Sequence, residues 1–226
     1  MSKKPNCKDI TYRATKNKGL NYVDEYSEFW HFAGNWIKRS RRSGNEMSKF
    51  IHLWVSFNAW ASMVVPDITK NHLDMYVVSS IAAAKRFNNR FETLIEEDDL
   101  FRNQVNKFVP LLPVFQVLWL NNNNIDSWNN YEDRRQFVDS VRERNPYSKD
   151  GYKMFSPPCA YEHFDMGEEI PQDWPHVMNA IYRVRCNLFH GGKMFNSPAD
   201  RQFVNLTYDI LWSVWKGFIP EHLRQK

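Results

Sequence analysis

Hydrophobic residues recur at intervals of three and four positions along much of this chain. The clearest stripe follows Asn45 and consists of Phe50, Leu53, Trp54, Phe57, Ala61 and Val64. This spacing is typical of an amphipathic α-helix. Asn45 is a good N-cap, Glu46 suits a first turn, and Pro66 breaks the pattern. The pattern therefore predicts a helix from Asn45 to Pro66.

Similar but weaker patterns predict helices over about 23–42 and 71–96. After residue 96 the pattern weakens, and the apolar run at 109–120 contains two prolines. We expect loops at 121–124 and 146–172 and a surface helix at 130–145. Because it has no full core pattern of its own, we interpret 109–172 as an insertion and not a second domain.

Two helices are expected at the end of the chain. The first starts at Asp173 as N-cap, ends at Gly191-Gly192, and carries Val177, Ala180, Ile181, Val184 and Leu188 on one face. The second opens with Ser197-Pro198 and carries Phe203, Leu206, Ile210, Leu211, Val214 and Phe218. Together the patterns predict an all-α, up-and-down helical bundle with an irregular insertion before the 173–190 helix. The domain would cover 23–226, after a basic tail at 1–22.

The composition of the 226 residues, 42% hydrophobic and 15% aromatic, is that of a packed globular protein. The longest apolar run, at 109–120, is shorter than the roughly 20 residues that span a bilayer. The amino terminus lacks the apolar stretch of a secretory signal, and the three cysteines are an odd number in unrelated settings. We therefore expect a cytoplasmic protein with reduced thiols and no membrane association.

Charge is distributed unevenly. Residues 1–18 hold six Lys or Arg and one Asp, and 38–42 (KRSRR) hold four basic residues and no acid. Residues 174–199 contain Arg183, Arg185 and Lys193 without a carboxylate, which favours a site for a polyanion. For the tail and KRSRR, a solvated face of the protein is an equally good interpretation.

The stretch RCNLFHGG (185–192) places Arg185 five residues before His190. At 100° per residue the two side chains differ by about 140°, so they do not share a face of a continuous helix. They would converge on one ligand if the last turn unwound, which the glycines allow. The alternative is a flanking arginine and a histidine that complements the negative end of the helix dipole.

The Arg–His pair suits phosphodiester cleavage. A guanidinium binds phosphate oxygens through two parallel hydrogen bonds, and a histidine can transfer protons near neutral pH. RNA supplies its own nucleophile, the 2′-OH, so this chemistry uses no metal and no cofactor. We recognise no zinc, phosphate-loop, dinucleotide or serine-hydrolase motif. Cys186 beside Arg185 is more simply interpreted as a small buried thiol.

The segment YRVRCNLFHGGK (182–193) resembles the R-x4-6-H signature of the HEPN superfamily, which lies near the end of a helix in a small helical bundle. WVSFNAW (54–60) is similar to an earlier helix of such proteins, where Asn58 would lie beside the site. The resemblance is specific over about a dozen residues at the motif, looser over 45–96 and 173–219, and absent over 109–172 and the tail.

The resemblance implies a metal-independent endoribonuclease that leaves 2′,3′-cyclic phosphate ends and acts as a toxin or anti-phage defence effector. Arg185 would hold the scissile phosphate and His190 would transfer protons, with Asn187, Lys193, Arg183 and Asn58 as auxiliary or phosphate-binding residues. Relatives often have a polar residue directly after the arginine, where this chain has Cys186. Relatives usually form homodimers with a composite active site, and an antitoxin or effector protein is a further expected partner.

Two alternatives stay open. One is a catalytically silent HEPN-like scaffold or binding subunit that partners an antitoxin or another effector. The other is an RNA-binding or protein-interaction bundle that uses exposed tryptophans. Most of the nine tryptophans fall at stripe positions, which core packing explains. Trp128 and Trp174 lie in or beside irregular segments and are the candidates for partner or base-stacking contacts.

Overall fold

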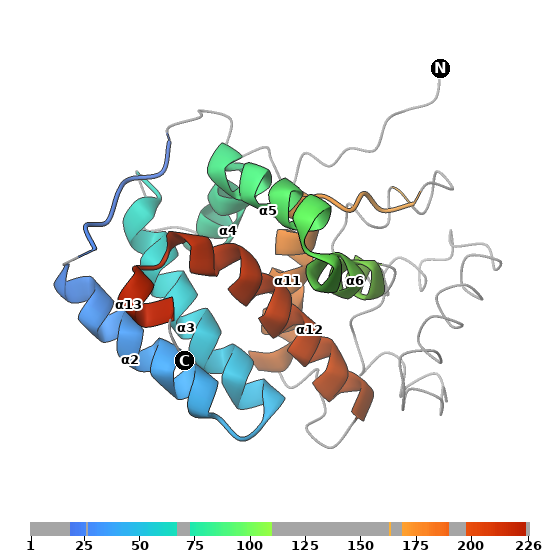
Figure 1. The fold of residues 1–226 in the computed structure, drawn as a ribbon, viewed down its shortest axis with the longest axis horizontal. Helices are drawn as coiled ribbons and strands as arrows, with labels where there is room; N and C mark the ends of the chain where they lie inside the picture. The colour runs from blue at the N-terminus through green and yellow to red at the C-terminus, as the bar shows by residue number, and fades with distance from the viewer. Residues whose placement is uncertain are drawn as a thin grey trace.

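The computed structural model describes residues 19–25, 27–66, 73–109, 163, 169–189 and 198–224. The regular elements in these ranges are all helical, which confirms the predicted all-α helical bundle (Figure 1). They are α2 (Glu28–Arg42), α3 (Glu46–Val64), α4 (Leu73–Ala83), α5 (Lys85–Glu97), α6 (Asp99–Phe108), α11 (Trp174–Phe189), α12 (Pro198–Trp215), the 3-10 turn η3 (Lys216–Phe218) and α13 (Glu221–Arg224).

Helices α2 and α3 form a hairpin joined by a three-residue connection. As predicted, the Asn45 side chain caps α3 by accepting a hydrogen bond from the Ser48 amide at 2.9 Å. Two serines tie the helices together, since Ser56 Oγ donates to the Ala33 carbonyl and Ser40 Oγ donates to the Lys49 carbonyl. Helix α2 begins at Glu28, later than the predicted start near residue 23.

The predicted helix over 71–96 is wrong at its centre, because the chain turns at Ala84 into extended backbone and forms two helices, α4 and α5. No glycine or proline marks the break. The Asn88 side chain donates to the carbonyls of Ala82 and Ala84 at 3.0 Å, which replaces part of the helical hydrogen bonding. Phe87 then stacks on Phe218, with ring centroids 4.1 Å apart. Tertiary packing therefore decides where α4 ends.

Helix α6 was not predicted, although its signals are present in the sequence. The Asp98 side chain caps it by accepting from the Phe101 amide at 3.0 Å. Phe101, Val105 and Phe108 are buried at helical spacing. Val109, assigned above to the insertion, also belongs to the core. The rest of 109–172, including the predicted surface helix at 130–145 and Trp128, lies outside the described residues except for 163 and 169–172.

Helices α11 and α12 provide the other half of the core. Asp173 caps α11 by accepting from the His176 amide at 3.0 Å, as predicted. The predicted stripes of α3, α11 and α12 are buried or nearly so, and Leu188 and Phe218 pack partly buried against the core. They enclose an aromatic cluster in which Trp215 contacts Phe57 and Trp60.

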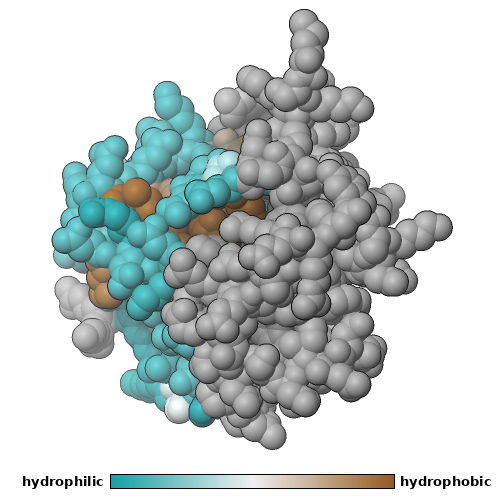
Figure 2. All heavy atoms as spheres, turned by 90° about the vertical axis from the view of Figure 1, so that its right-hand side faces the viewer, coloured by the Kyte–Doolittle hydropathy of each residue, from teal (hydrophilic) through white to brown (hydrophobic). Residues whose placement is uncertain are grey.

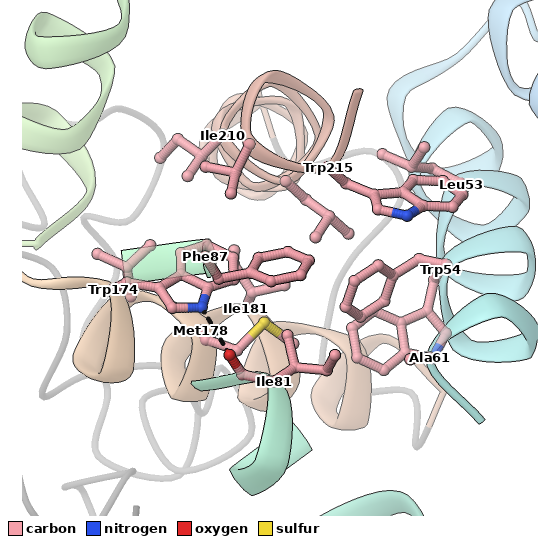
Figure 3. Packing of buried hydrophobic residues seen from close by; sticks show 14 of the residues in the cluster. Leu53, Trp54, Ala61, Ile81, Phe87, Trp174, Met178, Ile181, Ile210 and Trp215 are labelled. Atoms are coloured by element: carbon pink, nitrogen blue, oxygen red, sulfur yellow. Dashed lines mark hydrogen bonds between the residues drawn. The ribbon is translucent and has the colours of Figure 1, made fainter. Parts of the chain in front are cut away.

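Trp174 corrects an expectation, because it is no exposed stacking surface. Its side chain is 1% exposed, and its indole N–H donates to the Ile81 carbonyl at 3.1 Å (Figure 3). Phe87 stacks on the indole with ring centroids 5.5 Å apart. A tryptophan at the very start of a helix therefore fastens α11 to α4 and α5.

The side of the molecule at the right of Figure 1 presents a mostly hydrophilic described surface, with hydrophobic residues in small areas (Figure 2). Within the described ranges, none of the helices combines the length and the apolar character needed to cross a membrane.

Candidate functional site

Arg185 lies one turn before the end of α11, on the edge of the helix beside its buried stripe. The N-cap at Asp173 and the buried Val177, Ile181 and Val184 fix the position and rotation of α11. The Arg185 side chain is 21% exposed, so it is partly open to solvent. The sequence-predicted phosphate-binding residue is therefore held at the surface by a rigid helix.

The guanidinium of Arg185 is paired with a carboxylate from another helix. Its Nη2 donates to Asp74 Oδ2 on α4 at 2.9 Å, across 111 positions of the chain. The window 174–199 is free of carboxylates in the sequence, but its surroundings in space are not. Carboxylate and phosphate oxygens accept from a guanidinium in the same way, so Asp74 occupies an edge of Arg185 that a phosphate would use.

Three aromatic rings surround the same guanidinium. The Arg185 Cζ lies 5.9 Å from the Trp54 ring centroid, 5.8 Å from that of Tyr182 and 4.9 Å from that of Phe189. Its Nη1 also contacts Cys186 Sγ at 3.8 Å. Cation–π contacts of this kind restrict the orientation of the group without neutralising its charge. Arg185 is thus pre-oriented by its neighbours.

Tyr182 shares this environment and stays protonated over the physiological range. Burial, together with Cys186 and then Asp74, raises the pKa of Tyr182 to about 12, which the Arg185 charge only partly opposes. Cys186 is half-buried and forms no disulfide with a described residue, so it is more accessible than the buried thiol expected from the sequence.

The other described site residues do not gather around Arg185. Arg183 and Asn187 are half-buried and each lie two positions away, about 160° round the helix. Asn58 is half-buried on α3, one turn after Trp54, and its carbonyl accepts from Ser62 Oγ. Among the described contacts of Arg185, Trp54 and not Asn58 represents α3.

His190 and Lys193 lie outside the described residues. Helix α11 is regular as far as Phe189, so the turn that precedes His190 is not unwound. The unwinding of the last turn that would bring Arg185 and His190 together is therefore not seen in the described part of α11, which ends at Phe189.

Sequence reasoning missed Asp74 and the contact of Trp54 with Arg185. Trp54 was identified as a core residue, and it is one, but its ring also contacts the site. No local signal marks Asp74, because its role depends on how α4 docks against α11. Among the described residues, no group of three His, Cys, Asp or Glu side chains is arranged to bind a metal.

The chain matches no protein-family model, no curated protein and no solved structure.

Proposed function

We propose that this protein is a metal-independent endoribonuclease of the HEPN type, acting as a toxin or anti-phage effector. The 2′-OH of a nucleotide attacks the adjacent phosphorus, the bond from phosphorus to O5′ breaks, and the products carry a 2′,3′-cyclic phosphate and a 5′-hydroxyl. Arg185 holds the phosphate, and His190 transfers the proton that leaves the 2′-OH or reaches O5′.

One observation supports this proposal above the others. The arginine of the R-x4-H motif lies near the end of α11 in an all-α bundle, partly exposed and held by three aromatic rings. A pre-oriented guanidinium binds phosphate with less loss of side-chain freedom than a mobile one. An arginine that merely flanked a helix would not require such an environment.

A homodimer with a composite active site is part of the proposal. The described part of α11 keeps Arg185 on a different face from Asn187, and on a continuous helix Arg185 and His190 differ by about 140°. Two copies related by a twofold axis would bring Arg185 of one copy beside His190 of the other. Mixing the Arg185→Ala and His190→Ala proteins should then restore about a quarter of wild-type cleavage, because half of the dimers are mixed and carry one intact centre. No restoration, with dimers shown by light scattering, would contradict this arrangement.

The silent scaffold stays a second candidate because of the Asp74–Arg185 pair. A carboxylate already bonded to the guanidinium at 2.9 Å is an arrangement that a structural ion pair also produces. Under this alternative Asp74 and Arg185 stabilise the bundle, and the protein binds a partner without cleaving RNA.

The test compares wild type, Arg185→Ala, His190→Ala and the control Arg201→Ala, which removes an exposed arginine from α12. Each protein is incubated with total RNA and tRNA in excess EDTA, and the new ends are identified chemically. We expect wild type and Arg201→Ala to leave cyclic phosphate ends and the two site variants to be inactive while their thermal unfolding stays cooperative. Activity that EDTA removes, or equal cleavage by His190→Ala, would overturn the proposal. Absence of cleavage in all four would favour the scaffold.

A further inference from the structure

A basic groove lies where α13 packs against α2, α3 and α12. Its volume is about 990 Å³, and Figure 1 shows α13 lying beside α2 and close to the end of α12. No residue of α4 or α11 lines it, so it is distinct from the surroundings of Arg185. The lining residues are Lys38, Arg41, Arg42, Lys49, Tyr208, Trp212, Lys216, His222, Leu223 and Arg224.

The lining of this basic groove is strongly cationic. It includes six lysines and arginines, one histidine and no Asp or Glu. The acid next to Tyr208 in the chain is Asp209, whose Oδ2 accepts from Gln104 and Asn205 at 3.2 Å. Burial raises the pKa of Asp209, and Lys49 partly offsets this. The groove therefore concentrates positive charge at a concave surface, which attracts polyanions.

The walls of the groove are fixed by specific contacts. Arg41 Nη2 donates to the Leu223 carbonyl at 2.7 Å, and its guanidinium lies 4.6 Å from the Trp212 ring centroid. A Cβ on Gly34 would come within 2.8 Å of a Leu223 methyl, so glycine is what allows α13 to approach α2 this closely. Arg41 thus connects α2 to α12 and α13. The other cations of the lining surround it.

The basic surface continues beyond the groove. A second hollow of about 380 Å³ is lined by Asn35, Lys38, Arg39, Arg42, Ser43 and His52. Lys38 and Arg42 line both hollows, so the two share a cationic ridge. The four basic residues of KRSRR, all on α2, therefore each line at least one of the two hollows. We call the groove and the second hollow together the basic track.

We propose that this track binds a single-stranded nucleic acid through its phosphodiester backbone. Two hollows joined by shared cations suit a chain of phosphates better than one small phosphorylated molecule, for which a single pocket of 300–1,000 Å³ suffices. The half-buried Tyr208 and Trp212 provide aromatic surface for bases.

The lining does not have the composition of a membrane-binding surface. Such surfaces insert large apolar side chains beside their cations. The exposed large hydrophobic residues of the described chain are Tyr22, Phe32, Met63, Leu100 and Phe189, and none of them lines the groove or the second hollow. Nucleic acid is therefore the polyanion that this lining fits.

The inference goes beyond the proposed function, because it assigns a second site that no residue of α4 or α11 lines. The test measures binding under conditions in which the protein does not cleave. Fluorescence anisotropy is recorded for 15-nucleotide RNA and DNA strands of the same sequence with full-length His190→Ala protein. A test variant adds Lys38→Gln and Arg42→Gln, both exposed, and a matched control adds Lys107→Gln and Arg201→Gln, also exposed. We expect the test variant to bind on the order of tenfold more weakly at 0.1 M salt and the control to bind like the parent.

RNA and DNA strands that both lose affinity support backbone recognition, and a larger loss for RNA supports the same groove with added ribose contacts. Equal affinities of the test and control variants overturn the proposal. So does the binding of phosphatidylserine vesicles, but of neither strand, in a manner that depends on Lys38 and Arg42. Circular dichroism melting of both variants shows whether each is folded.

Discussion

The surroundings of Arg185 and the basic groove treat positive charge in opposite ways. Arg185 is one cation with a carboxylate at 2.9 Å and three aromatic rings within 6 Å. The groove has six permanent cations and no carboxylate in its lining. In the sequence the two regions look alike, because 174–199 and KRSRR both lack acids. Local charge counts therefore do not report the charge balance that a ligand meets.

The two environments suit different tasks. A neutralised, pre-oriented guanidinium contributes little long-range attraction, but it binds an anion in a defined geometry once the carboxylate yields. A cluster of cations with no carboxylate in its lining attracts a polyanion from a distance, with weak geometric demands and strong dependence on salt. Under the two proposals above, the α11 region would cleave the RNA and the basic groove would bind it. Three predictions test this division, and a fourth concerns a buried acid behind the groove.

The largest expected effect is on the cleavage rate, and it separates the cleavage step from RNA binding. Loss of His190 in His190→Ala should lower the single-turnover cleavage rate at saturating RNA by roughly 10²–10⁴-fold, because proton transfer is lost. The Lys38→Gln, Arg42→Gln variant should lose cleavage chiefly at low RNA concentration, because its deficit is in binding. Rates measured across RNA concentrations check this. If the Lys38→Gln, Arg42→Gln variant still cleaves as slowly relative to wild type at saturating RNA, its defect is not in binding. That result would contradict the division between cleavage and binding.

Salt dependence gives the next effect in size. If Lys38 and Arg42 each contact a phosphate, removing both should reduce the slope of log affinity against log salt by about 1.4. The affinity lost between 50 and 200 mM salt then becomes about sevenfold smaller. Arg185→Gln should change the slope by less than the roughly 0.7 expected for one uncompensated cation, because Asp74 already compensates its charge. Anisotropy titrations on a DNA strand, which lacks the 2′-OH, measure both slopes. Equal changes for the two variants would contradict the comparison.

Removing the Asp74 carboxylate should make the surroundings of Arg185 resemble the basic groove in charge. In Asp74→Asn the competing charge is gone while Tyr182 and Phe189 still orient Arg185, so we expect RNA affinity to rise a few-fold. Because both partners are partly exposed, the free energy of unfolding should fall by about 1 kcal/mol or less. Anisotropy and urea unfolding measure the two quantities. Weaker binding by a folded Asp74→Asn would show that Asp74 positions Arg185 and does not compete for it.

The smallest effect concerns Asp209 behind the groove. Burial raises its pKa in the folded protein above the ordinary value of 3.8, so folding favours the protonated carboxyl. Its contribution to stability is thus most favourable at low pH and declines as pH rises through the folded pKa. Asp209→Asn keeps an acceptor for Gln104 and Asn205, and should be more stable than wild type at pH 7 by at most about 1 kcal/mol. The difference should vanish below pH 3.8 in urea unfolding; a difference independent of pH would contradict this account.

Local signals predicted α3 and α11 well because their caps and stripes lie within a few turns of each other. Asn45 and Asp173 each accept from an amide three residues on, an interaction that depends on little else. The same kind of signal marks α6, where Asp98 caps the helix and Phe101 and Val105 begin its buried stripe. The break at Ala84 carries no such signal, because packing of Phe87 decides it.

The sequence by itself determined the all-α bundle, the burial of its main stripes and the place of Arg185 near the end of α11. Only the tertiary structure decided what surrounds that arginine, where Trp174 points, and that KRSRR joins residues of α12 and α13 in one groove. The reason is physical. Caps and periodicity act between neighbouring turns, whereas an ion pair across 111 positions or a groove between helices exists only after those helices have packed.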